Sequence, residues 1–200
     1  MSVSGPRMKK SVLLAAAALF AGSSAPAFAH LDPAEHGSVM AGLTHPLFGA
    51  DHVLAMIAVG LWAAQIGGRA LWSVPAAFVA TMVLGFVLAH TGAPLPLVEP
   101  AILASVVALG LVVAIAVRLD AATAAAIVAA FALFHGHAHG GELGSAGTWS
   151  FAAGFVIATA LLHMAGMGLG MGLARLADRG VVTRIVGGAT AIAGAALILG

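Results

Sequence analysis

Hydrophobic residues occur in six long runs, and short segments rich in glycine, proline or charge separate them. A helix needs about 20 apolar residues to cross roughly 30 Å of hydrocarbon. The pattern therefore predicts an all-α membrane protein with six transmembrane helices. The expected helices cover about 43–66, 72–90, 97–117, 121–139, 149–174 and 181–199. The connections have turn compositions and are too short for an extramembrane domain, so residues 30–200 should form one domain.

The first 29 residues have the pattern of a secretory signal peptide. A positive segment with Arg7, Lys9 and Lys10 precedes an apolar stretch, and Ala27-Phe-Ala29 is a small-residue cleavage site. Cleavage after Ala29 would leave His30 as the new N-terminus, where its amine and imidazole can chelate together. An uncleaved anchor helix is the alternative.

The start of the first mature helix has two interpretations. Thr44 is a suitable N-cap, and Pro46 is tolerated in a first helical turn. Alternatively the helix begins near Ser38, and Pro46 then kinks it and releases the Gly42 carbonyl. Either geometry predicts irregular backbone beside the polar residues that follow.

Charge predicts the orientation of the helices. Signal cleavage would place the mature N-terminus in the periplasm, so the odd-numbered helices would run inward. Positive residues then fall on or near the inner connections, in agreement with the positive-inside bias. These residues are Arg69, Arg118, Arg175, Arg179 and Arg184, whereas Asp32, Glu35, Glu99 and Glu142 fall outside.

Composition narrows the function further. The 200-residue chain is 62% hydrophobic and 8% charged, which is far from a soluble domain with its roughly 25% charged residues. A net charge of +1 without a clustered basic face argues against nucleic acid as a partner. The absence of cysteine excludes thiolate metal sites and cysteine nucleophiles, whereas the nine histidines outnumber the seven acidic residues.

Several histidines should meet near the outer side of the bilayer. Asp51 and His52 lie in an apolar run, where an acid costs about 2.5–3.5 kcal/mol and usually marks an ion or substrate path. His45 and His52 are seven residues apart and should share a helix face. His135 and His139 are four apart and should share another.

Each polar residue also has a structural interpretation. His45 fits a surface cap, the group His135, His137 and His139 fits an interfacial polar helix end, and His90 fits an interfacial terminus. His163 fits either a hydrogen bond between helices or an inner relay for an ion. Met167 and Met171 continue its stripe and are typical of packing.

The types of side chain indicate which ions would bind. Neutral imidazole with a carboxylate suits nickel, cobalt, zinc and copper(II), whereas magnesium and calcium need oxygen-rich cages. The methionines keep copper(I) as an alternative. A haem- or metal-holding membrane subunit is a further alternative. An intramembrane enzyme is disfavoured because the sequence contains no His-Glu-x-x-His or Gly-x-Ser-x-Gly motif.

Two motifs resemble the HupE/UreJ family of nickel permeases. The first is His45-Pro-x-x-Gly49-x-Asp51-His52-x-Leu54-x-Met56, and the second is Phe134-His135-Gly136-x-Ala138-His139-Gly140-x-Glu142. The resemblance implies an inner-membrane permease, not an enzyme, with no permanent cofactor. Its substrate would be Ni²⁺ or Co²⁺, delivered indirectly to nickel enzymes, hydrogenase or urease.

The residues divide into two sets of candidate metal ligands. The resemblance implies functional roles for His45, Asp51, His52, His135, His139 and Glu142. Further possible ligands are His30, His36, His90, His137 and His163.

Overall fold

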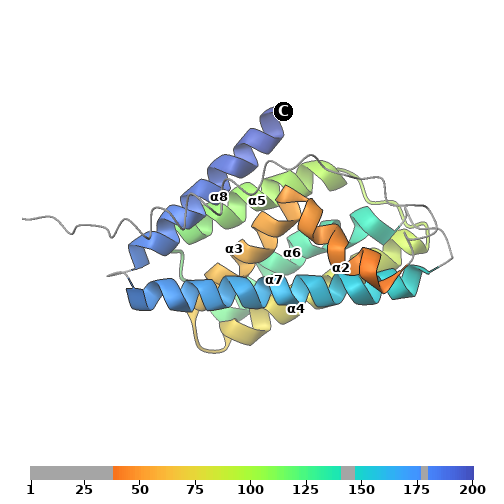
Figure 1. The fold of residues 1–200 in the computed structure, drawn as a ribbon. Helices are drawn as coiled ribbons and strands as arrows, with labels where there is room; N and C mark the ends of the chain where they lie inside the picture. Colours follow the sequence, from red (N-terminus) through yellow and green to blue (C-terminus); the bar gives the residue numbers. More distant parts are fainter. Residues whose placement is uncertain (1–37, 141–146, 177–179) are drawn as a thin grey trace, which may run out of the picture.

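The structure, a computed structural model, describes residues 38–140, 147–176 and 180–200, and in these ranges the regular elements are helices. They are α2 (Val39–Phe48), α3 (Ala50–Ile66), α4 (Ala70–His90), α5 (Val98–Ala114), α6 (Ala121–Gly140), α7 (Thr148–Leu176) and α8 (Val181–Leu199) (Figure 1). The expected signal peptide, His30, His36, Arg179 and Glu142 lie outside the described residues.

The helices have the lengths and composition of a membrane protein. Four of them, α4, α6, α7 and α8, are long and apolar enough to cross a bilayer. The bent pair formed by α2 and α3 would make a fifth span, and α5 is apolar but has only 17 residues. The all-α membrane class is therefore confirmed at this level, and six crossings remain a prediction.

The prediction of one continuous helix over 43–66 is wrong. The structure has two helices in this part of the chain, and they meet at 87° around Gly49. α2 begins after Ser38, whose hydroxyl oxygen accepts a hydrogen bond from the Ala41 amide at 2.9 Å. Thr44 is not the N-cap, since its hydroxyl donates to the Met40 carbonyl inside the helix. The alternative start near Ser38 is confirmed, with Pro46 inside α2. A proline there cannot donate the backbone hydrogen bond that continues a helix, and the chain breaks three residues later.

The helix predicted at 97–117 is also too long. Its C-terminal end is fixed by side chains that donate to backbone carbonyls just where α5 stops. Trp62 donates to Val117 at 2.9 Å, and Gln65 donates to Val113 at 3.0 Å. Val117 lies beyond the last helical turn, where carbonyls lack helical partners, and the Val113 carbonyl accepts the Gln65 amide in addition to the Ala116 backbone amide. The remaining predicted helix ends agree with the structure to within two residues.

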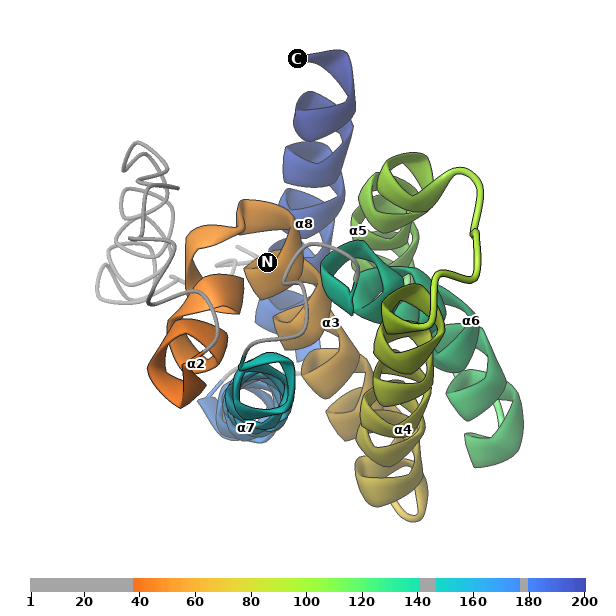
Figure 2. The ribbon, with the colours of Figure 1, turned by 90° about the vertical axis from the view of Figure 1, so that its right-hand side faces the viewer.

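Glycines bring pairs of helices into backbone contact. A Cβ added at each would lie far inside van der Waals distance of a backbone atom on the neighbouring helix. The contacts are Gly42 with Phe151 and Gly60 with His163 (α2 and α3 on α7), Gly136 with Met82 (α6 on α4), and Gly110 with Ala191 (α5 on α8). Small residues allow this close approach between helices in lipid. Figure 2 looks along α7 and shows α2 on one side of it and α4 on the other.

The order of these contacts gives the helix directions. Gly60 meets Gly166 and Ala64 meets Gly170, so α3 and α7 run the same way. Gly136 meets Met82 and Gly140 meets Phe86, so α4 and α6 also run the same way. This arrangement agrees with the expected topology, in which the first and fifth helices share one direction and the second and fourth share another.

The positive side chains gather where α3 and α5 end and α6 and α8 begin. Arg69, Arg118 and Arg184 are exposed, and the Arg184 Nε–H donates to the Ala114 carbonyl at 2.8 Å. Asp120 caps α6 here, and the hydrogen bonds from Thr123 hold the pKa of its carboxyl below the usual range. This end of the bundle lies opposite the one that holds the candidate ligands.

Candidate metal-binding site

The break at Gly49 places the beginning of α3 against the interior of the bundle. Asp51 stands in the first turn of α3, and its carboxylate accepts a hydrogen bond from the His52 amide at 2.8 Å. The first turn of a helix has unpaired amides and a positive dipole end, and both stabilise a carboxylate. The bend therefore gives an acidic side chain a favourable position among apolar helices.

Three imidazoles and this carboxylate form one continuous hydrogen-bonded chain. His52 Nδ1 lies 2.9 Å from Asp51 Oδ1, and His52 Nε2 lies 2.9 Å from His139 Nε2. His139 Nδ1 in turn lies 3.1 Å from His45 Nε2. We call the side chains of Asp51, His52, His139 and His45 the histidine chain. It joins α2, α3 and α6, which are distant in the sequence.

The carboxylate sets the proton order along the histidine chain. An ionised Asp51 can only accept, so His52 carries its proton on Nδ1 and has a lone pair on Nε2. His139 must then donate from Nε2 to His52, which leaves Nδ1 to accept the Nε2–H of His45. Each ring is thus held in one tautomer by its neighbour.

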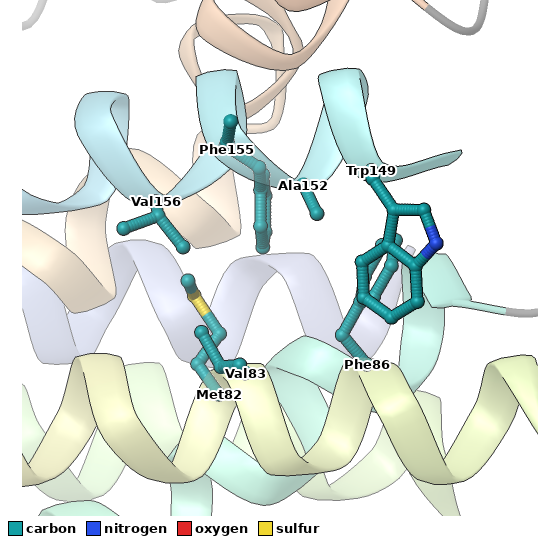
Figure 3. A pocket seen from close by; sticks show the side chains of 8 residues that line it. Met82, Val83, Phe86, Trp149, Ala152, Phe155 and Val156 are labelled. Carbon is teal, nitrogen blue, oxygen red and sulfur yellow. The ribbon is translucent and has the colours of Figure 1, made fainter. Parts of the chain in front are cut away.

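Phenyl rings of α7 cover the histidine chain. Phe155 lies with its ring centroid 5.2 Å from that of His139, and it also contacts His45 and His52. Behind Phe155 an apolar hollow of about 240 Å³ separates α7 from α4, and Phe86 and Trp149 lie at one end of it (Figure 3). The polar groups are therefore held in an apolar surrounding, where electrostatic interactions are strong.

His135 extends the site inward. It is fully buried, and its ring centroid lies 5.0 Å from that of His52. The hydroxyl of Ser105 donates to the Ile102 carbonyl at 2.6 Å, so its oxygen accepts the Nε2–H of His135 at 2.9 Å. This leaves the His135 Nδ1 lone pair without a hydrogen-bond partner in the described ranges. A histidine oriented through its other nitrogen is the usual form of a metal ligand.

The other histidines within the described ranges lie away from the histidine chain. The side chain of His137 points to the loop after α4, where its Nε2–H donates a hydrogen bond to the Ala93 carbonyl at 2.8 Å. It lines a second hollow of about 380 Å³ together with Glu99. His90 packs on Trp149, with ring centroids 5.6 Å apart. His163 is buried on α7 and is separate from the chain.

The described part of the chain contains no group of three or more ligands already arranged around a common point. The reason is visible in the hydrogen bonds, because the imidazole nitrogens point at one another. Nitrogens bound to one ion at about 2.1 Å and a right angle are about 3 Å apart, close to the 2.9 Å between His52 and His139. The two ring nitrogens thus already have the separation that two ligands of one ion at a right angle would have.

The relation between His45 and His52 differs from the expected one. His45 and His52 do not share a helix face, since the 87° bend puts them on different helices. They come together through His139 instead. Ser105 and Phe155 were not identified from the sequence, and a serine in an apolar run two turns from a helix start was the only signal for the first.

Comparisons with known proteins agree with the motifs. The model of the HupE / UreJ protein family matches residues 15–197. Protein HupE of Rhizobium leguminosarum bv. viciae is 47% identical over 178 residues, which cover 88% of this chain and 92% of that protein. No solved structure matches. The family is one of transporters rather than enzymes and is related in general to nickel and cobalt transport. The resemblance seen in the motifs is thereby confirmed, and the chain belongs to the HupE/UreJ family.

Proposed function

We propose that this chain is an inner-membrane permease that takes up a divalent transition-metal ion, nickel first and cobalt as the alternative. The observation that carries the proposal is the histidine chain, in which three imidazoles meet a carboxylate inside apolar helices. Ionisable groups in such positions mark ion pathways. Imidazole with carboxylate is the donor set that borderline divalent ions prefer.

Binding would exchange hydrogen bonds for metal bonds. His139 holds its neighbours through both ring nitrogens, so an ion between His139 and His52 must displace the Nε2–H of His139. Its proton would then occupy Nδ1 and donate to His45 Nε2, so His45 would have to carry its own proton on Nδ1 instead of Nε2. Asp51 stays bonded to His52 Nδ1 and keeps the Nε2 lone pair directed outward for the ion.

The broken helix favours a cation at the same place. His45 lies in the last turn of α2, where backbone carbonyls without helical partners carry partial negative charge. Asp51 supplies a full negative charge across the bend. Discontinuous helices with such ends surround the binding sites of many transporters.

The positions of the arginines support an orientation with the site on the outer side. With α2 and α3 counted as one crossing and α5 as another, the chain crosses six times and the exposed arginines face the cytoplasm. The histidine chain then lies on the periplasmic side. A doubly charged ion moving inward gains about 4.6 kcal/mol per 100 mV of membrane potential, so uptake needs no nucleotide site.

Uptake of radiolabelled nickel by bacterial cells that express the chain tests the proposal. We expect accumulation well above that of cells with an empty vector, competition by unlabelled cobalt stronger than by magnesium, and loss of accumulation when an uncoupler removes the membrane potential. Accumulation equal to that of the empty vector, with the protein present in the membrane, would contradict the proposed function.

A further inference from the structure

His163 is a buried imidazole that the histidine chain does not use. It lies in the middle of α7 and is 1% exposed. Neither of its ring nitrogens has a hydrogen-bond partner in the part of the chain that the structure describes. Buried polar groups are nearly always paired, because burial removes their water, so an imidazole with two unpaired nitrogens needs an explanation. A bound ion is one such explanation.

The position of His163 places it further along the same interior. The buried face of α7 carries Phe155, Thr159 and His163 at intervals of four residues. Phe155 covers the histidine chain, and His163 follows it by eight residues, or about 12 Å along the helix axis. The direction is toward the end of the bundle where the arginines gather.

One phenyl ring contacts both His163 and the inner end of the described site. The Phe78 ring centroid lies 4.9 Å from that of His163 and 5.6 Å from that of His135. The two imidazoles therefore rest on the same phenyl ring of α4. His135 Nδ1 also lacks a partner in the described ranges. Unpaired imidazole nitrogens thus lie before and after Phe78 on the way inward.

We propose that His163 is a second, inner binding station for the transported ion, an inference that rests on the proposed permease function. One imidazole nitrogen is a weaker site than the several donors of the histidine chain, and water would complete the coordination. Weak binding at successive positions is what conduction requires, since the ion must leave as readily as it enters. The ion would pass from His135 past Phe78 to His163.

Substitutions of similar size separate an ion-binding role from a packing role. His163→Leu fills the space without a donor, whereas His163→Met keeps a sulfur that binds borderline and soft ions. Met164→Leu is the control, because this neighbour is half exposed and faces away from the interior. The probe is Ni²⁺ alone, and initial uptake rates are divided by the amount of protein in the membrane.

We expect His163→Leu to lower the maximal rate about tenfold or more and to leave the half-saturating nickel concentration unchanged, because the histidine chain still captures the ion. His163→Met should keep a rate clearly above that of His163→Leu, and Met164→Leu should match the wild type. Should His163→Leu fail to insert, His163→Phe takes its place with the same expectation.

Two results would contradict the proposal that His163 binds the ion. One is a wild-type uptake rate in His163→Leu. The other is an equal loss of rate in His163→Leu and His163→Met, which would indicate that His163 acts by packing against Phe78. Both differ from failure of the proposed function, in which the wild-type chain itself does not accumulate nickel.

Discussion

Asp51→Asn and His52→Ala should each reduce nickel accumulation to the level of cells without the protein. The asparagine side chain would bring no negative charge, and it would no longer fix the His52 tautomer, because its amide can present either an acceptor or a donor to Nδ1. Removal of His52 takes away the imidazole that His139 contacts at 2.9 Å. Loss of the partner that orients a metal ligand costs about tenfold to a hundredfold in affinity or activity, and loss of the ligand itself should cost no less. Radiolabelled nickel uptake measures the effect.

His90→Ala is the matched control for these variants. It also removes an imidazole from a membrane helix, but His90 packs on Trp149 and does not contact the histidine chain. We expect it to accumulate nickel at a rate close to that of the wild type. All variants must be present in the membrane in equal amounts. Near-normal uptake by Asp51→Asn and His52→Ala together would remove the histidine chain from the transport mechanism.

Gly136→Ala should strongly reduce the amount of folded protein. A Cβ at this position would collide with the Met82 carbonyl oxygen, and the Met82 carbonyl carbon and the Phe86 amide nitrogen of α4 would lie only 2.7 and 2.9 Å from it. α4 and α6 would have to move apart, and His135 and His139, which flank Gly136 on α6, would move with them. Overpacking of a well-packed interior costs about 1–3 kcal/mol, and a clash with backbone atoms should lie at the upper end of this range. The thermal stability of the purified protein in detergent, followed by gel filtration after heating, measures the loss.

Gly168→Ala provides the contrast on α7. A Cβ at Gly168 meets no atom within 4 Å, so the substitution adds a methyl group on an open helix face. Alanine in a helix is more favourable than glycine by about 0.5–1 kcal/mol, and stability should stay the same or rise slightly. Equal stability of the two variants would show that the contact between α4 and α6 is looser than described.

Periodicity and length were sufficient for the helices but not for the bend. Five of the predicted runs correspond to one helix each, because an apolar run of that length has few alternatives in lipid. The run at 43–66 contains Pro46 and Gly49, which signal irregular backbone. Neither residue fixes an angle of 87°, which depends on how α2 packs on α7 through Gly42.

Residue type predicted much of the candidate site, and helical phase predicted less. An acid and a histidine in an apolar run identify the region because their burial is costly. The seven-residue spacing predicted that His45 and His52 lie on the same face of one continuous helix. This is wrong, since they lie on separate helices and both contact His139. Ser105 could not be recognised because it acts through His135, a partner 30 positions away in the sequence. The role of Glu142 as a metal ligand stays a prediction, because this residue lies outside the described ranges.

X-ray absorption at the nickel edge tests most directly whether the imidazoles of the histidine chain bind the ion. Purified wild-type protein in detergent, loaded with an equimolar amount of Ni²⁺, should show the outer-shell scattering of imidazole rings, and His139→Ala should show less of it. A spectrum that resembles that of the hydrated ion, or one that His139→Ala leaves unchanged, would contradict binding of the ion by the histidine chain.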